Sequence, residues 1–297
     1  MVGKRPAAEK IDYFLGDPLA IGPVEVPNRV VLAPMSGITD APFRRLAERL
    51  GAGLVVSEMT ACAGLARGGR EPAVRSEGSG VGVHVVQLAG CVSAVRVPVT
   101  LKMRLGWDES TINAPALAQR AEAAGIKLIT VHGRTRCQFF DGRADWRAVR
   151  RVKQAVAIPV VVNGDIHSCA DAVQALVDSR ADAVMIGRAV QGRPWLPGQI
   201  ARYFATGAHS VTPSLAEQFD LIDALYEEML NHHGLTIGPR HARKHLGWAL
   251  NSAAVTAGAS AELLKHHRNR VLTAEEPRSV RLMLAEAFDD FGRRAAA

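Results

Sequence analysis

The residues best suited to chemistry in this 297-residue chain come directly after short apolar stretches. The first are Pro34, Met35 and Ser36, a small turn at which a flat ring can approach the backbone. Another stretch alternates apolar and polar residues, so that Lys102 and Arg104 share one face and point into a barrel if the apolar face packs under helices. Because a buried unpaired cation is costly to desolvate, these cations indicate either an anionic ligand or a core carboxylate partner.

Two further turns contain the glycines and the cation that a phosphate clamp needs. Glycine lets backbone N–H groups face an anion, and arginine adds a planar, bidentate cation. Each turn alone is weak evidence, but two such turns after successive apolar stretches favour a phosphate site. The turns are Asn163, Gly164 and Asp165, followed by Gly187 and Arg188.

His132 ends another apolar stretch, where its imidazole can donate to a ring carbonyl or to a base. A single histidine in such a place is more often a plain hydrogen-bonding residue, so its weight comes from its neighbours. The four cysteines have neither CxxC nor Cys/His metal spacing, which disfavours disulfides and a zinc site. We therefore expect no metal. The sequence contains no GxGxxG, Walker-type or HExxH motif.

These positions can act together if the stretches before them are parallel strands. Short β-branched stretches alternate with helical ones through the first two thirds of the chain, which is typical of repeated βα units. In a TIM-type barrel, ligands bind at the C-terminal ends of the strands. The predicted fold class is therefore α/β, an incomplete TIM-type (β/α) barrel. Its seven expected strands lie at 30–33, 54–57, 83–88, 99–103, 128–131, 160–162 and 183–186.

After about residue 211 the strand pattern ends and amphipathic helices follow. We predict a linker at 206–213, which divides the chain into a barrel at 1–205 and an all-helical domain at 206–297. Between Gly238 and Arg281 there are eight Lys or Arg residues and three Glu. This excess indicates a polyanionic partner such as nucleic acid, or merely a solvated basic face. The expected helices are 215–230, 241–254, 262–272 and 277–291.

The overall composition is that of an ordinary globular protein, with 48% hydrophobic and 22% charged residues and a net charge of +7. No stretch approaches the roughly 18 consecutive apolar residues that a membrane helix needs. The polar, basic first ten residues are not followed by the apolar core of a secretory signal. We expect a cytoplasmic protein without a membrane segment.

Taken in order, six motifs closely resemble the bacterial tRNA-dihydrouridine synthases, particularly the branch named after nitrogen-regulation proteins. The resemblance extends from about Asn28 to the C-terminus, and the basic helical tail resembles the family's RNA-binding domain. Its motifs are specific in combination. They are VLAPMSGITDAPFR (31–44), VVSEM (55–59), QLAG (87–90), LKMR (101–104), VHGRTR (131–136) and NGDI (163–166).

The resemblance implies an FMN enzyme that uses NADPH to reduce the C5–C6 double bond of uridines in tRNA. Hydride passes to C6, and a cysteine acid protonates C5. It further implies that Lys102 stabilises the reduced ring, that Gln87 contacts the ring edge, and that His132 lies near the ring or the flipped uracil. The expected flavin contacts also include Pro34, Met35 and Ser36 at the ring and Asn163, Gly164, Asp165, Gly187 and Arg188 at the ribityl phosphate; the expected tRNA contacts are Arg240, Arg243 and Lys244.

The chain departs from the family pattern after residue 90. The family continues with a helix, a strand that ends in an Asn-Met-Gly-Cys-Pro motif, a loop and another helix, whereas Cys91 here is followed directly by 92–98. By this comparison about sixty residues are missing, roughly two βα repeats. The acid cysteine is among them. Cys91 is the only cysteine placed to substitute for it, although an incidental residue of the turn explains it more simply.

The shortened segment has consequences for the fold and for activity. Residues 90–97 span at most about 26 Å when extended, which leaves no room for a crossover helix. We therefore expect an imperfect barrel and impaired reduction. Two other functions stay open: a catalytically silent tRNA-binding protein, and a different FMN barrel oxidoreductase that acts on a small molecule. The target uridine and the oligomeric state are also left open.

Overall fold

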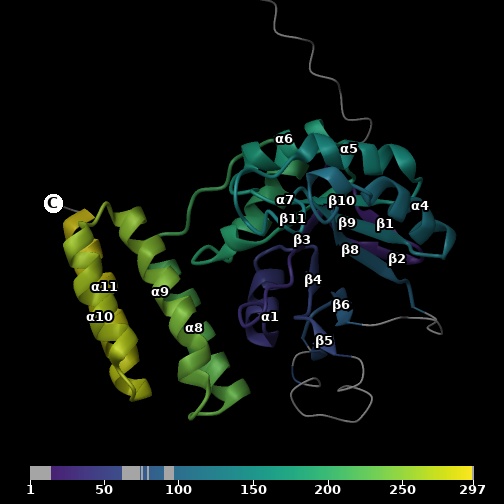
Figure 1. The fold of residues 1–297 in the computed structure, drawn as a ribbon. Helices are drawn as coiled ribbons and strands as arrows, with labels where there is room; N and C mark the ends of the chain where they lie inside the picture. Colours follow the sequence, from purple (N-terminus) through teal and green to yellow (C-terminus); the bar gives the residue numbers. More distant parts are fainter. Residues whose placement is uncertain (1–14, 62–73, 75, 79, 90–96, 296–297) are drawn as a thin grey trace, which may run out of the picture.

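The computed structural model describes residues 15–61, 74, 76–78, 80–89 and 97–295. Its centre is a parallel seven-stranded sheet with the strand order β6-β4-β3-β11-β10-β9-β8 (Figure 1). Within the described residues the edge strands β6 and β8 do not pair with each other, so the expected incomplete barrel is confirmed. The strands are β3 (Val30–Leu32), β4 (Leu54–Val56), β6 (His84–Val85), β8 (Thr100–Arg104), β9 (Leu128–His132), β10 (Val160–Asn163) and β11 (Ala183–Ile186).

The alternation of side chains along the strands builds two apolar clusters. Val30 and Leu32 pack in the larger cluster, which also takes in residues of the surrounding helices, whereas Val31 packs in a smaller one. An antiparallel hairpin, β1 (Leu19–Ile21) with β2 (Val24–Val26), adds its apolar residues to the smaller cluster. The hairpin lies beside the residues that precede β8 and β9, and so covers the amino-terminal end of the sheet.

The strand expected at 83–88 is in fact two short strands in different sheets. β6 pairs with β4, but β7 (Leu88–Ala89) pairs with β5 (Thr60–Ala61) in a separate two-stranded sheet. Between them, the backbone N–H of Gln87 donates to the Ser57 hydroxyl at 3.0 Å instead of continuing the ladder. This side-chain bond ends the pairing with β4, which the apolar character of 83–88 did not reveal.

Helices cover the outside of the sheet, and side-chain caps begin two of them. The Asp40 carboxylate accepts from the Phe43 N–H at 3.1 Å, and the Ser168 hydroxyl accepts from the Asp171 N–H at 3.1 Å. These helices are α1 (Ala41–Arg49), α4 (Ala114–Ala123), α5 (Trp146–Ala155), α6 (Cys169–Ser179) and α7 (Leu196–Thr206), with short 3-10 turns η1 (Glu109–Thr111) and η2 (Arg188–Val190).

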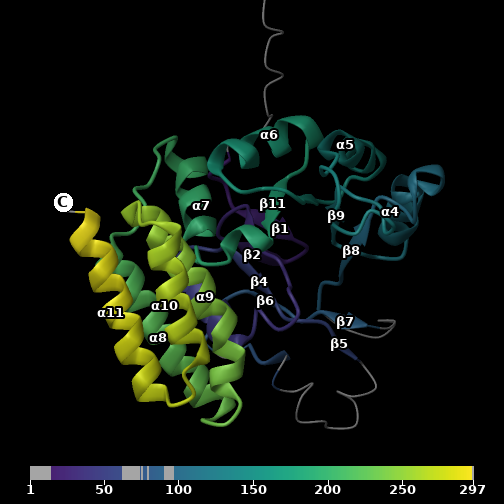
Figure 2. The ribbon, with the colours of Figure 1, turned by 60° about the vertical axis from the view of Figure 1, so that its left-hand side comes forward.

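The C-terminal part contains only helices among the described residues; they pack side by side, and α8 lies against α1 of the barrel (Figure 2). They are α8 (Leu215–His233), α9 (Gly238–Ala257), α10 (Ala261–Thr273) and α11 (Pro277–Ala295). The division into two domains at residues 205 and 206 stays a prediction. None of the described helices has the length and apolar character that crossing a membrane requires.

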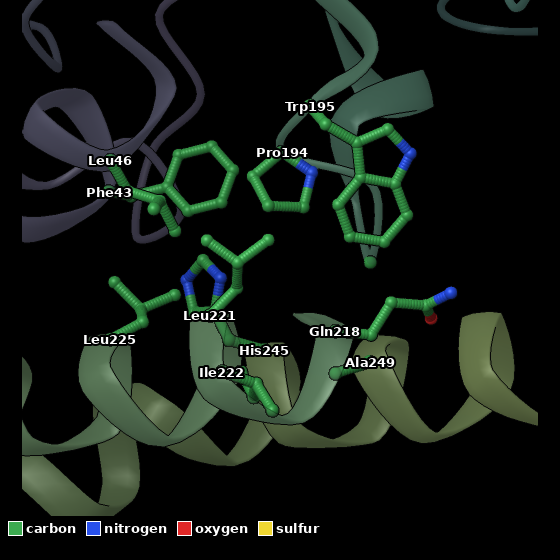
Figure 3. A pocket seen from close by; sticks show the side chains of 11 residues that line it. Phe43, Leu46, Pro194, Trp195, Gln218, Leu221, Ile222, Leu225, His245 and Ala249 are labelled. Carbon is green, nitrogen blue, oxygen red and sulfur yellow. The ribbon is translucent and has the colours of Figure 1, made fainter. Parts of the chain in front are cut away.

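The junction between the barrel and the helices is apolar, with a small cavity of about 20 Å³ (Figure 3). Phe43 of α1 faces the His245 ring of α9, with ring centroids 5.0 Å apart. His245 is buried, and desolvation lowers its pKa to about 4. At the edge of the junction, the His233 Nε2 atom lies 2.8 Å from the Asp40 carboxylate. α8 and α9 are thus joined to α1 by both packing and a polar bond.

Candidate functional site

A cavity of about 460 Å³ lies at the carboxyl ends of the central strands. It draws its lining from the segments after β3, β8, β9, β10 and β11, as parallel βα topology requires. Of the eleven residues expected to contact a cofactor, all but Gln87 line it. They are Pro34, Met35, Ser36, Lys102, His132, Asn163, Gly164, Asp165, Gly187 and Arg188.

Lys102 and Arg104 project from β8 into this cavity. Desolvation lowers the pKa of the Lys102 amine, and the nearby Arg104 charge lowers it further. No described carboxylate forms an ion pair with either side chain. Among the described residues, Lys102 therefore has no core carboxylate partner, which was the alternative to an anionic ligand.

His132 lies at the end of β9, buried among cations. Desolvation lowers its pKa to about 3, and the charges of Arg104 and Lys102 contribute further. The Arg134 guanidinium lies 3.4 Å from Nε2 and can only donate, which favours the tautomer with the proton on Nδ1. At neutral pH His132 is therefore an uncharged imidazole.

Gly164 explains how His132 fits beside the turn after β10. A Cβ at Gly164 would lie 2.7 Å from the His132 ring and 2.8 Å from the Ala144 Cβ, and the residue has φ +116°. Neither contact nor conformation suits an L side chain. The turn that the sequence predicts to bind phosphate thus also needs a glycine for close packing.

Asp165 and Asn163 are engaged within the protein. The Asp165 carboxylate accepts from Arg134 at 2.5 Å and from the Ala144 N–H at 2.7 Å, and it lies 3.8 Å from Arg188. Burial raises the pKa of Asp165, but these donors outweigh it and the net pKa is lowered. The Asn163 amide donates to the Met185 carbonyl at 2.8 Å. Both side chains hold the turn, which leaves Gly164, Gly187 and Arg188 to face a ligand.

Some residues at the cavity are absent from the expected set. Gln87 does not line the cavity, because the backbone after β6 turns away from β4 to reach the second sheet. Phe140 and His167 do line it, the first from the loop after β9 and the second from the loop after β10. Only the position of these loops at the carboxyl ends of strands could have indicated them, since neither residue belongs to a phosphate or ring-binding pattern.

The three residues expected to contact RNA lie at the start of α9. Arg240 and Lys244 are exposed, but Arg243 is partly buried and its Nε atom has no hydrogen-bond partner. A Cβ at Gly37 would lie 3.0 Å from the Lys244 Nζ atom, so this amine touches the turn beside Ser36. Lys244, a residue of the helical part, therefore places its positive charge at the rim of the cavity.

None of the described cysteines lines the cavity. Cys137 is exposed in the loop after β9, and burial raises the pKa of the Cys169 thiol on α6. Cys91, the weak substitute candidate for the acid, lies outside the described residues.

One group of possible metal ligands occurs in the described part of the chain, at the junction of α1, α8 and α9. Donor atoms of Asp40, His233 and His241 lie within 4.8 Å of one another. However, the two imidazoles are stacked, with centroids 4.3 Å apart and planes at 10°. Stacked parallel rings cannot both direct a ring nitrogen in-plane at one ion. A hydrogen bond and a ring stack account for this group.

Comparison with known proteins identifies relatives along most of the chain. The model of the dihydrouridine synthase family matches residues 31–92 and 85–287. A probable tRNA-dihydrouridine synthase of Rickettsia conorii is 42% identical over 288 residues, which cover 77% of this chain and 86% of that protein. One of Rhizobium leguminosarum bv. phaseoli is 41% identical over 320 residues, covering 90% and 97%.

A third relative and a solved structure complete the comparison. The tRNA-dihydrouridine synthase B of Xanthomonas campestris pv. campestris is 40% identical over 285 residues, covering 77% of this chain and 86% of that protein. The structure of histamine dehydrogenase from Rhizobium sp. 4-9 aligns with TM-score 0.46 and 13% identity, covering 72% of this chain and 51% of that one. On the family match and these sequence identities, the chain belongs to the dihydrouridine synthase family.

Proposed function

We propose that the cavity binds FMN, that NADPH is the reductant, and that the chain acts on uridine in tRNA at a strongly reduced rate. The observation that carries this proposal is the excess of cations over carboxylates in the cavity. Lys102 and Arg104 have no carboxylate partner in the described part of the chain. Arg188 lies 3.8 Å from the carboxylate of Asp165, which also pairs with Arg134. An anionic ligand would compensate these charges.

The residues of the cavity fit a flavin nucleotide. Its volume of about 460 Å³ lies in the usual range for cofactor pockets. Gly187 and the exposed Arg188 suit a phosphate, while Met35 and Met185 offer apolar contact to a ring. When bound, the flavin would supply hydride-transfer chemistry.

The protein's own residues would bind and orient rather than donate a proton. The Lys102 amine would place positive charge beside the ring, from the wall of the cavity that β8 forms. Neutral His132 can donate a hydrogen bond from Nδ1, but a pKa of about 3 leaves it without the extra proton that an acid at neutral pH would need. We therefore assign His132 to binding, and not to the role of the cysteine acid in the family pattern.

The reduced rate follows from the absence of the segment that the family pattern has after residue 90. The family model matches this chain in two stretches that meet at residues 85–92, which supports a missing segment at that point. A lost general acid costs about 10² to 10⁴-fold in rate. The alternative of a catalytically silent tRNA-binding protein is favoured by the same observation, together with the exposed Arg240 and Lys244.

Two measurements on the full chain test the proposal. Purified protein should show a flavin absorption spectrum, release FMN on denaturation, and bleach when NADPH is added. Expressed in cells that lack every other dihydrouridine synthase, it should restore only a small fraction of tRNA dihydrouridine. Normal levels of the modified base would contradict the impaired rate. Retention of tRNA by a colourless protein that takes up no added FMN would favour the silent binder.

A matched pair of variants links the flavin to the cavity. Lys102→Met should weaken FMN binding about 10- to 100-fold, because a charged hydrogen-bond donor is lost. Lys127→Met is the control, since Lys127 is exposed just before β9, at the opposite end of the sheet. Equal FMN affinity in both variants would show that the flavin does not bind in this cavity.

A further inference from the structure

Exposed aromatic side chains surround an arginine beside the mouth of the cavity. Trp107, Phe139 and Phe140 are 64%, 55% and 55% exposed. Together with Arg136 they form what we call the aromatic–arginine platform. Single exposed apolar residues are common on proteins, but a contiguous group at the edge of a ligand cavity is typical of a binding surface.

Contacts within the platform make it continuous. The Arg136 Cζ atom lies 4.4 Å from the centroid of the Phe139 ring and 6.0 Å from that of Trp107. Phe140, the next residue, lines the cavity, and the Arg188 Cζ atom is 4.5 Å from its ring centroid. The platform therefore runs from the cavity outward to the loop after β8.

The loop that carries both phenylalanines is held rigidly from behind. Arg104 donates to the carbonyls of Thr135 and Phe139, each at 2.8 Å. Arg134 donates to the carbonyls of Asp141 and Gly142 at 3.0 and 2.7 Å.

Phe139 is held in an uncommon conformation. Its φ is +46°, which is unfavourable for a bulky side chain. The hydrogen bonds of the loop thus maintain a strained backbone that turns an apolar ring toward water.

The loop after β8 is fixed to the same support. The N–H of Arg136 donates to the Gly106 carbonyl at 2.9 Å, and the N–H of Cys137 donates to the Trp107 carbonyl at 2.8 Å. Trp107 and Phe139 are thereby both held beside Arg136 by bonds within the protein. Pre-organised aromatic groups bind with little loss of conformational entropy.

The charges select the chemical class of partner. Neither Arg104 nor Arg136 forms an ion pair with any described carboxylate, whereas flat aromatic faces beside uncompensated cations are the combination with which proteins bind unpaired nucleotides. Bases stack on the rings, and the arginine meets the phosphodiester. An acidic peptide would use the cations but would leave the ring faces in water.

We propose that the aromatic–arginine platform binds the unpaired nucleotides next to the uridine that enters the cavity, with Trp107 and Phe139 stacking on their bases. The platform rests on the proposed function, because it assigns the neighbours of that function's target base. It assigns the contact to the barrel itself, independently of the basic helix α9.

The test measures binding of an unmodified tRNA transcript to the full chain. The double variant Trp107→Ala/Phe139→Ala should bind at least tenfold more weakly, as stacking contributes about 5- to 150-fold per base. The salt slope of its binding should match the wild type, whereas Arg136→Gln should lower the slope by about 0.7 for one single-strand phosphate. Val255→Ala/Leu282→Ala is the control, since both are exposed apolar residues on α9 and α11.

A second measurement does not depend on how the alanine variants fold. Titration of the wild type with oligouridylate should quench tryptophan fluorescence, and Trp107→Phe should lose most of that quenching while the transcript still binds within a few-fold. Equal tRNA affinity in the double variant and the control, or equal quenching in Trp107→Phe, would overturn the platform alone. A wild type that binds no tRNA would overturn both the platform and the proposed tRNA substrate.

Discussion

Individual residues around the cavity are determined by steric fit as much as by charge. Gly164 lies where any side chain would collide with His132 and Ala144, and it also adopts a positive φ. His132 in turn stays neutral among Lys102, Arg104 and Arg134 because burial lowers its pKa to about 3. The fit of the turn therefore depends on the absence of a side chain at Gly164, next to a histidine that burial keeps neutral.

Gly164→Ala tests this dependence. It should destabilise the protein by about 1–3 kcal/mol more than Gly125→Ala, because both residues have positive φ but only Gly164 lacks space for a Cβ. Thermal unfolding of the two variants measures the difference. The two substitutions would lower the midpoint equally if the contact with His132 were easily relieved.

At the scale of elements, the start of α1 joins the barrel to the helical part. One oxygen of Asp40 caps α1 through the Phe43 N–H, and the other lies 2.8 Å from His233 at the end of α8. Burial raises the pKa of Asp40, but the His233 hydrogen bond and the His245 charge lower it more, so the net pKa lies below the ordinary value. An ionised aspartate therefore serves two elements at once.

Asp40→Ala should remove both functions. It should cost about 1 kcal/mol for the cap, plus the bond to His233, and it should speed proteolysis in the segment between α7 and α8. Asp40→Asn keeps a good capping residue and should preserve most of the stability. Ser168→Ala, which removes only the cap of α6, provides the control. Cleavage at the same rate in Asp40→Ala and Ser168→Ala would show that the polar joint is unimportant.

At the scale of the whole molecule, buried histidines make stability depend on pH. The folded pKa of His245 is about 4 and that of His132 about 3, both below the ordinary 6.5 because of burial. Below pH 6.5 the unfolded chain therefore binds protons that the folded chain does not, so stability is greatest above that pH and falls as the pH decreases toward 4.

His245 contributes most clearly, since it is almost fully buried at the junction. It should add a slope of roughly 1.4 kcal/mol per pH unit in this window. Thermal unfolding between pH 7.5 and 4.5 should show a flatter dependence for His245→Gln than for the wild type. His209→Gln is the control at an exposed histidine. An unchanged pH dependence in His245→Gln would mean that this imidazole is protonated in the folded protein.

The sequence by itself determined which residues gather at the cavity. Residues that directly follow parallel strands must meet at one edge, so the local pattern was enough to place Lys102, His132 and Arg188 together. It also indicated seven strands and an incomplete barrel, because the chain after residue 90 is too short for a full crossover.

Only the tertiary structure decided contacts that depend on residues distant in sequence. The Ser57 hydroxyl ends the ladder at Gln87 and removes that side chain from the cavity, although the residues around it are apolar and strand-like. Arg243 is drawn toward the interior of the helices while Lys244 on the same turn reaches Gly37 of the barrel. Periodicity reports which face of an element is apolar, whereas the partner of that face is set by packing between elements.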